Sequence, residues 1–305
     1  MRSLGPEQIL NSFLTQNFDT LYELCSSGQS GSLFYYTKDK RYMIKTIPKR
    51  EFSKFLSILQ KYYEHLKENP ETLISRFFGL HSVRWKDSKT KFQKRYLVIM
   101  NNVFKDFEVG VRYDLKGSTT GRNYLNPQQG LEYVEQNNIK TALKCNDFRR
   151  LMKQIILDEE GGKTRVTSGE LKQQCATFKQ VLTKDANFFA AAGIIDYSLL
   201  LGEVSDIDVQ DLKEQIRQNP ELGNGVYFDT EGRAWVIGII DPLTGFNFKK
   251  GVEYNLKRLR HGHDMSCVPP EIYAQRFKDF MAISIQSNVD PVESDQFEFD
   301  KGTRN

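Results

Sequence analysis

Patterns typical of strands and helices are unevenly distributed along this chain, and that distribution constrains the fold most. In the first hundred residues, apolar spacing predicts strands on either side of one amphipathic helix. In chain order, these elements are strands Leu33–Thr37 and Tyr42–Ile47, a helix that ends before Pro70, and strands Phe77–Trp85 and Arg95–Met100. The chain has 305 residues, more than most single domains, so we expect one large domain or two lobes that share a cleft.

The chain after Asn101 and Asn102 begins with a loop-rich stretch and continues with longer helical patterns. The expected elements are a helix capped by Asp147 and continuing through Ile156, a helix from about Leu171 to Gly193, a hairpin of Val226–Asp229 and Trp235–Ile240, and a helix from Glu271 to about Gln286. We therefore expect an N-terminal lobe over 1–101, a C-terminal lobe over 102–286, and an acidic, flexible tail over 287–305.

Charge and cysteine usage limit the class of protein. The net charge is only +4, but between Lys249 and Arg260 five basic residues stand against one acidic residue, Glu253. This segment favours attraction to an anionic surface, and a solvated basic loop is the alternative. No aromatic residues alternate with these charges in the manner of a nucleic-acid site, so nucleic acid is not expected as a partner. The four cysteines form no CxxC pair, which indicates reduced thiols in a cytoplasmic protein.

A glycine- and serine-rich segment before the first predicted strand suits a phosphate-binding loop. Gly28, Ser30 and Gly31 would let backbone N–H groups approach a phosphate closely. Lys45 follows Gly31 by fourteen residues, where a kinase-like fold places the lysine that holds nucleotide phosphates. A flexible turn and a solvent-exposed edge-strand lysine are the alternatives.

Two aspartates stand next to apolar segments. Asp241 directly follows the strand predicted to end at Ile240, which suits a ligand of Mg²⁺ together with phosphate oxygens. A turn begun by Asp241 and Pro242 is the alternative. Asp196 precedes an apolar run and could orient a hydroxyl nucleophile or bind a second metal.

The segment from Asp114 through Lys116 to Ser118, with Arg122 beyond it, combines opposite charges around a glycine. Such a set suits a site that manages several phosphate oxygens, although an ordinary surface loop has the same composition. Gly161–Thr164 looks like the end of a P-loop, but the upstream glycine is missing, and the four histidines include no HExxH zinc motif.

Together, these segments resemble the phosphatidylinositol phosphate kinase family. Asp114–Ser118 with Arg122 matches the family's DLKGSxxxR signature. The other similar segments, in the family's order, are Ser26–Tyr36, Met43–Thr46, Val98–Val103, Ile195–Gly202, Ile239–Asp241 and Tyr273–Met281. The likeness extends over about residues 20 to 285.

The resemblance implies a two-lobed α+β fold, distantly similar to protein kinases, with antiparallel sheets, flanking helices and ATP between the lobes. It implies that Lys45 contacts ATP phosphates beneath the loop of Gly28, Ser30 and Gly31, with Asn102 also at the nucleotide. It gives Mg²⁺ to Asp241 and the catalytic-loop position to Asp196. Lys116 and Arg122 would contact phosphate with support from Asp114. Glu51 is the only acidic residue near the start of the helix after Lys45, and it is the candidate ion-pair partner of that lysine.

The resemblance also concerns substrate and partners. The basic segment corresponds to the family's activation loop, which meets the membrane and selects the lipid. Its residues in this role are Lys249, Lys250, Glu253, Lys257 and Arg258. Glu253 favours phosphatidylinositol 4-phosphate as substrate, and Gly251 leaves the register of this loop open.

Three alternatives stay open: a kinase of the 5-phosphate lipid, a kinase of the 3-phosphate lipid, and a catalytically weak phosphoinositide-binding scaffold. The expected location is peripheral, on the cytosolic face of a membrane. Members of the family often dimerise, so a homodimer is one of the oligomeric states that the sequence leaves open.

Overall fold

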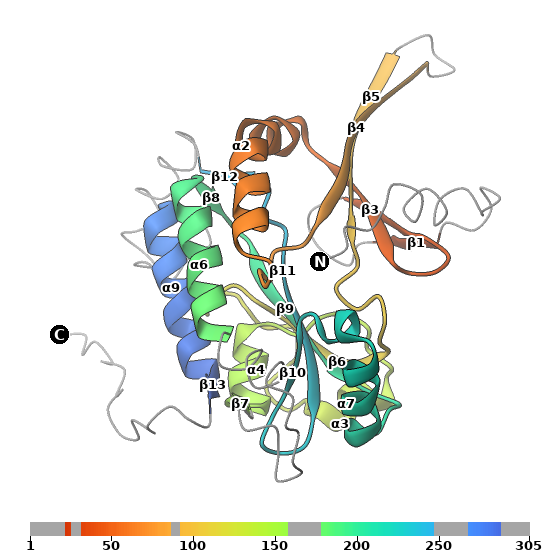
Figure 1. Cartoon of the computed structure of the whole chain (residues 1–305), viewed down its shortest axis with the longest axis vertical. Helices are drawn as coiled ribbons and strands as arrows, with labels where there is room; N and C mark the ends of the chain where they lie inside the picture. The colour runs from red at the N-terminus through yellow and green to blue at the C-terminus, as the bar shows by residue number, and fades with distance from the viewer. Residues whose placement is uncertain (1–21, 26–31, 87–91, 158–177, 247–267, 288–305) are drawn as a thin grey trace.

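The computed structural model describes residues 22–25, 32–86, 92–157, 178–246 and 268–287, which combine helices with mostly antiparallel sheets (Figure 1). This is the α+β architecture that the sequence predicts. The expected acidic tail lies outside the described residues, apart from its first residue, Ser287. No helix in these ranges is long and apolar enough to cross a membrane.

The N-terminal sheet has five strands in the order β1-β2-β3-β5-β4, and all neighbours are antiparallel. The strands are β1 (Tyr22–Cys25), β2 (Leu33–Tyr36), β3 (Tyr42–Ile47), β4 (Phe77–Lys86) and β5 (Phe92–Asn101). Helix α2 (Lys49–Glu68) buries Phe55, Ile58 and Tyr62, a spacing of three and four residues that follows the helical period. The predicted order is confirmed from β2 onward, and β1 is an additional strand before it.

The second sheet has four antiparallel strands in the order β10-β11-β9-β6. They are β6 (Val109–Leu115), β9 (Ser198–Val204), β10 (Val226–Phe228) and β11 (Ala234–Ile240). The predicted hairpin of β10 and β11 is confirmed. The loop-rich assignment after Asn102 is wrong for β6, where alternate side chains are buried in the manner of a half-buried strand.

Two small sheets complete the strands. β8 (Ile194–Ile195) pairs with β12 (Thr244–Gly245), and β7 (Ile155–Leu157) pairs in parallel with β13 (Ile285–Ser287). The helix predicted to continue through Ile156 therefore ends earlier, because Ile155 and Ile156 belong to β7 and pair with β13.

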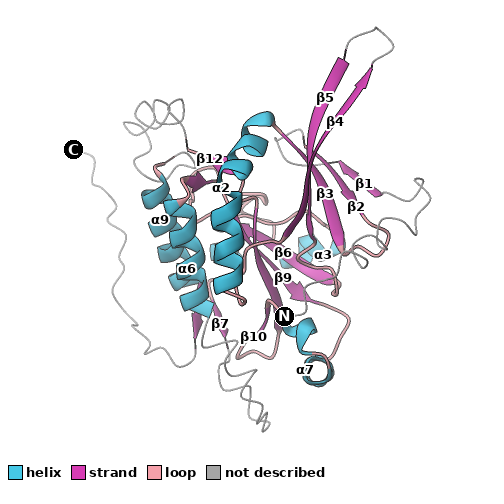
Figure 2. Cartoon of the chain, turned by 45° about the horizontal axis from the view of Figure 1, so that its top comes forward, coloured by secondary structure: helices cyan, strands magenta, loops and turns pink. Residues whose placement is uncertain are grey.

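The helices of this part are α3 (Leu131–Gln136), α4 (Cys145–Leu151), α6 (Phe178–Ala191), α7 (Val209–Gln218) and α9 (Pro270–Ser284), with a 3₁₀ helix over Pro220–Gly223. Helices α6 and α9 lie side by side (Figures 1 and 2). Asp147 lies inside the first turn of α4 rather than before it, and its carboxylate accepts the backbone N–H of Lys144 (2.9 Å). The predicted start of α6 near Leu171 lies outside the described residues, and α9 ends at Ser284, two residues before its predicted end.

One hydrophobic cluster joins the two sheets. It includes Phe55 of α2, Ile74 before β4, and Leu199 and Ile239 of the second sheet. Ile74 forms a β-bridge with Ile239, and the backbone N–H of Ile239 donates to the carbonyl of Leu73 (2.7 Å). The segment before β4 thus attaches the N-terminal sheet to the strand that ends next to Asp241.

Candidate active site

The pairing of β6, β9 and β11 brings three sequence motifs to one edge of the second sheet. Leu115, the last residue of β6, lies opposite Leu199, and Ser198 lies opposite Ile240, the last residue of β11. Lys116 and Asp241 therefore leave this edge, and Asp196 enters it two residues before β9. The pairing of Ile195 with Thr244 draws the chain around Asp196 and Asp241 together a second time. Motifs far apart in sequence thus meet because strand register requires it.

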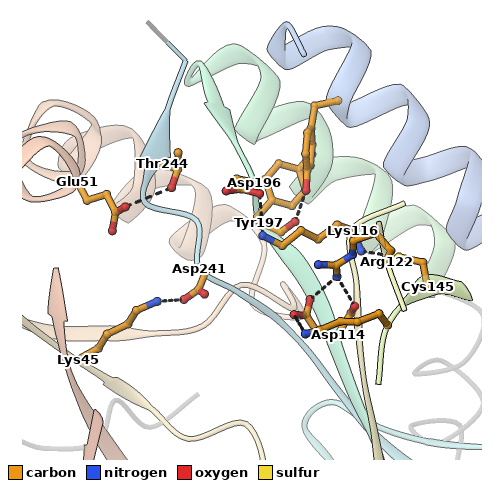
Figure 3. A network of polar contacts seen from close by, with 12 residues as sticks. Lys45, Glu51, Asp114, Lys116, Arg122, Cys145, Asp196, Tyr197, Asp241 and Thr244 are labelled. Carbon is orange, nitrogen blue, oxygen red and sulfur yellow. Dashed lines mark hydrogen bonds and ion pairs between the residues drawn. The ribbon is translucent and has the colours of Figure 1, made fainter. Parts of the chain in front are cut away.

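Asp196 forms an ion pair with Lys116, whose Nζ lies 2.7 Å from Oδ1 (Figure 3). The backbone φ of Asp196 is 70°, in the left-handed region that few residues other than glycine and short polar residues adopt. The hydroxyl of Tyr273 donates to the carbonyl of the next residue, Tyr197 (2.5 Å). A strained backbone held by a buried tyrosine fixes the carboxylate of Asp196 beside Lys116.

Asp241 forms an ion pair across the two sheets with Lys45 of β3 (Figure 3). The Lys45 side chain is only 8% exposed and that of Asp241 is 41% exposed, so the exposed edge-strand alternative for Lys45 is wrong. Asp241 also has a positive φ, 58°. A buried ammonium requires an anionic partner, and the half-exposed carboxylate of Asp241 supplies it here.

Glu51 of α2 does not take that role in this structure. Among the described residues, Lys45 forms its ion pair with Asp241, whereas Glu51 accepts a hydrogen bond from the hydroxyl of Thr244 (3.4 Å). Burial raises the pKa of Glu51, and the nearby charge of Lys45 opposes that rise. Glu51 is therefore an electrostatic neighbour of the pair between Lys45 and Asp241.

Asp114 is the centre of a cluster of cations beside the Lys116–Asp196 pair. Its Oδ2 lies 2.7 Å from Nζ of Lys144, and Arg122 Nη2 donates both to the Asp114 carbonyl (2.7 Å) and to Oδ1 (3.3 Å). Burial disfavours the charged carboxylate, but Lys144, Arg122 and Lys116 outweigh it and hold the pKa of Asp114 at about 2. This segment is a partly buried charge network, and the surface-loop alternative is wrong.

Lys144 is the functional candidate that sequence reasoning missed. It stands directly before α4 and reaches Asp114 thirty residues back in the chain. Next to it, the buried thiol of Cys145 accepts the backbone N–H of Lys116 (3.3 Å). No local pattern marks Lys144, and its only sequence signal is its position at the start of an amphipathic helix.

The donor set is compatible with a divalent cation held mainly by phosphate oxygens. No group of three or more His, Cys, Asp or Glu side chains converges within the described ranges, so the protein does not offer a complete metal cage there. Mg²⁺ is commonly bound by one or two carboxylates together with substrate phosphates. Asp241, half-exposed at the end of a rigid strand, fits that requirement.

The remaining predicted residues lie apart from this network or outside the described residues. The Asn102 carboxamide donates to the carbonyl of Lys40 (2.9 Å) and accepts the backbone N–H of Phe104 (3.1 Å), so it supports the connection after β5. Its contact with a nucleotide stays a prediction. The predicted residues outside the described ranges are Gly28, Ser30, Gly31, Lys249, Lys250, Glu253, Lys257 and Arg258.

Comparison with known proteins agrees with the motifs at this sheet edge. The family model described as phosphatidylinositol-4-phosphate 5-kinase matches residues 15–226 and 210–284. A phosphatidylinositol 4-phosphate 5-kinase of Plasmodium falciparum is 32% identical over 92% of this chain and 17% of its own length. Phosphatidylinositol 4-phosphate 5-kinase its3 of Schizosaccharomyces pombe is 30% identical over 88% of this chain and 42% of its own length.

The chain spans less than half the length of these relatives. A probable phosphatidylinositol phosphate kinase of Dictyostelium discoideum, 28% identical over 88% of this chain, is likewise matched over only 43% of its length. The family model nevertheless extends over most of the chain, including every motif at the sheet edge. The chain therefore belongs to the phosphatidylinositol-4-phosphate 5-kinase family.

Proposed function

We propose that this protein is a lipid kinase that transfers the γ-phosphate of ATP to phosphatidylinositol 4-phosphate and forms phosphatidylinositol 4,5-bisphosphate. The observation that carries the proposal is the sheet edge at which Asp196, Lys116 and Asp241 meet Lys45 from the other sheet. Phosphoryl transfer spreads negative charge over several oxygens, and fixed cations around that charge are the main catalytic requirement.

Each side chain has a role that follows from its surroundings. Lys45, buried and facing the second sheet, would hold ATP phosphates. Lys116 and Arg122 would bind the transferred or substrate phosphate, and Asp114 with Lys144 keeps Arg122 in position. Asp196 would orient the attacking hydroxyl of the lipid and accept its proton, with Lys116 stabilising the carboxylate.

A magnesium ion would be held by Asp241. When bound, such an ion neutralises charge on phosphate oxygens and orients them for in-line transfer. The accessible carboxylate of Asp241 and its position next to Lys45 support this assignment.

The choice of lipid and the location rest on the sequence. Glu253 favours the 4-phosphate lipid, and the names of the relatives from Plasmodium falciparum and Schizosaccharomyces pombe agree with it. The basic segment between Lys249 and Arg260 would draw the protein to the anionic cytosolic face of a membrane.

A direct test measures phosphate transfer from radiolabelled ATP to vesicles that contain the 3-, 4- or 5-monophosphate of phosphatidylinositol. We expect preferential conversion of the 4-phosphate, and a loss of about a hundredfold or more in kcat for Asp241→Asn. Asp279→Asn, on the exposed face of α9, is the matched control, and circular dichroism checks that each variant folds.

Three results would each contradict a different part of the proposal. Preference for another lipid would contradict the substrate. Full activity of Asp241→Asn would contradict the metal role. No transfer to any of the three lipids would contradict the kinase activity itself.

A further inference from the structure

The β4–β5 hairpin extends well beyond the rest of the N-terminal sheet (Figures 1 and 2). β3 accompanies β5 only as far as the pair Ile47–Tyr96, whereas β4 and β5 stay paired as far as Lys86–Phe92. Among the described residues, the outer part is therefore a two-stranded ribbon without a third strand. Such ribbons have little stability of their own in water, so the sheet itself does not require this extension.

Two large aromatic side chains stand exposed near the free end of this ribbon. Trp85 is 40% exposed and Phe92 is 74% exposed. Trp85 lies opposite Gln93, and Phe92 lies opposite Lys86. Since directly opposite residues share a face and successive residues alternate, Trp85 and Phe92 project from opposite faces of the ribbon. If the free end of the hairpin is inserted into a partner, the rings of both Trp85 and Phe92 contact that partner.

The charge of the same ribbon is entirely positive among its described residues. The residues 81–86 and 92–95 include Arg84, Lys86, Lys94 and Arg95 and no Asp or Glu. Within the described part of the chain, none of these four forms an ion pair with a carboxylate. Arg84 lies directly opposite Lys94, a like-charge pair that destabilises an isolated ribbon. An anionic partner would relieve this repulsion.

Protection of a sheet edge accounts for only part of this pattern. β4 is the edge strand, and charges such as Arg84 and Lys86 prevent edge-to-edge pairing with another chain. That function does not require exposed rings at Trp85 and Phe92, because large apolar groups promote association instead.

We propose that this hairpin surface, formed by Arg84, Trp85, Lys86, Phe92, Lys94 and Arg95, docks on an anionic lipid bilayer. Aromatic rings concentrate at the level of the lipid headgroups, and each basic residue near an anionic leaflet strengthens the attraction. At a rise of about 3.3 Å per residue, the four cations lie within about 10 Å of the two rings along the ribbon. They therefore lie at the depth of the lipid phosphates when the rings enter the headgroup layer.

The choice of a bilayer as the partner rests on the proposed lipid kinase function. The position of the hairpin is compatible with it, because both views place the free end of the hairpin and β12 in the upper part of the molecule (Figures 1 and 2). β12 begins three residues after Asp241. A bilayer contacted by the hairpin thus lies toward the part of the molecule that also contains β12.

Tryptophan fluorescence tests the contact directly, because the chain has only two tryptophans and Trp235 is fully buried. The probe is a vesicle of phosphatidylcholine and phosphatidylserine without phosphoinositide, with and without brominated acyl chains. We expect a blue shift and bromine quenching in the unchanged protein, and loss of both in Trp85→Phe. Sedimentation of the protein with vesicles without any quenching would overturn the proposal.

Vesicle sedimentation with variants of the hairpin provides the second test. We expect Lys86→Glu with Lys94→Glu, and separately Trp85→Ala with Phe92→Ala, to weaken binding about tenfold or more. The matched controls are Lys140→Glu with Lys153→Glu, and Tyr124→Ala with Tyr133→Ala, exposed residues of the second lobe that should leave binding unchanged.

A kinase assay on water-soluble, short-chain phosphatidylinositol 4-phosphate separates this inference from the proposed function. Hairpin variants should keep their rate on that substrate while they lose vesicle binding. If the hairpin variants keep both their vesicle binding and their activity on the water-soluble substrate, the docking surface is overturned and the proposed kinase function is not. Binding of single-stranded RNA or an acidic protein by the hairpin, without binding to the vesicles, also overturns it. Absence of soluble activity instead contradicts the kinase function and leaves the vesicle measurement valid.

Discussion

At the scale of single residues, the ionisation of Asp114 depends on the three cations around it. Its folded-state pKa of about 2 is below the ordinary value of 3.8, so the ionised form stabilises the folded protein above about pH 4. That stabilisation is lost as the pH falls from about 4 to 2, and it amounts to about 2 kcal/mol. Asp114→Asn should therefore lower the free energy of unfolding at pH 7, with a difference from the unchanged protein that shrinks toward pH 2.

Urea unfolding at a series of pH values between 2 and 7 measures this difference. Asp279→Asn, an exposed carboxylate on α9, should show no such dependence. A difference between Asp114→Asn and the unchanged protein that is the same at every pH would contradict the role assigned to the charge of Asp114.

Four of the site residues that sequence analysis found stand in short motifs at strand ends. Asp114, Lys116, Asp196 and Asp241 were found in this way, and strand register explains why they meet. The positions of the side chains were not predictable. The sequence predicts that Lys45 pairs with Glu51, but Lys45 pairs with Asp241 of the second sheet. These two residues lie 196 positions apart, so no local pattern indicates that they meet.

At the scale of elements, the turn after β6 depends on the absence of a side chain at Gly117. Its φ is +77°, and a Cβ there would lie 3.0 Å from the backbone Cα of Phe277 in α9. Gly117→Ala should therefore combine backbone strain with a collision against a helix, which we expect to cost about 2 to 4 kcal/mol. Thermal unfolding should show a lower Tm, and a displaced Lys116 should also reduce kinase turnover.

Gly121→Ala is the matched control, because Gly121 also has a positive φ (+67°) but a Cβ there would meet no atom within 4 Å. It shares the backbone strain without the collision. Equal losses of Tm for the two variants would show that contact with α9 does not limit this turn.

Some of the elements that sequence analysis missed are defined by distant pairing, whereas α7 was also missed although it is a local element capped by Asp208. β7 consists of three residues whose apolar pattern continues the spacing of α4, and it becomes a strand by pairing with β13 near the end of the described chain. β6 does show alternation, but Asp114 on its second face pairs with the cations of the charge network, which obscures the pattern of a simple surface strand. Local periodicity identified the long helices and the two hairpins, where local contacts dominate.

At the scale of the whole molecule, a buried carboxylate connects α6 to α2 and to the segment before β4. Asp185 of α6 is fully buried and lies 2.7 Å from Nε2 of His65 in α2. It also accepts the hydroxyl of Thr72 (2.6 Å) and the backbone N–H of Leu73 (2.9 Å). These partners come from the N-terminal part of the chain, more than a hundred residues away. Sequence analysis predicted two lobes but gave no sign of this connection, since an Asp inside an amphipathic helix normally faces water.

Asp185→Ala should weaken the attachment of α2 and of the segment before β4 to α6, because Thr72 and Leu73 then keep buried donors without an acceptor. We expect the free energy of unfolding to fall by about 3 kcal/mol. Hydrogen exchange should become faster in the amides of α2 than in those of β11. Asp279→Ala on neighbouring α9, whose exposed carboxylate accepts only from Gln275 among the described residues, is the matched control and should change neither quantity. An unchanged unfolding midpoint for Asp185→Ala would mean that the apolar contacts around Ile74 and Ile239 hold these elements together without help from this carboxylate.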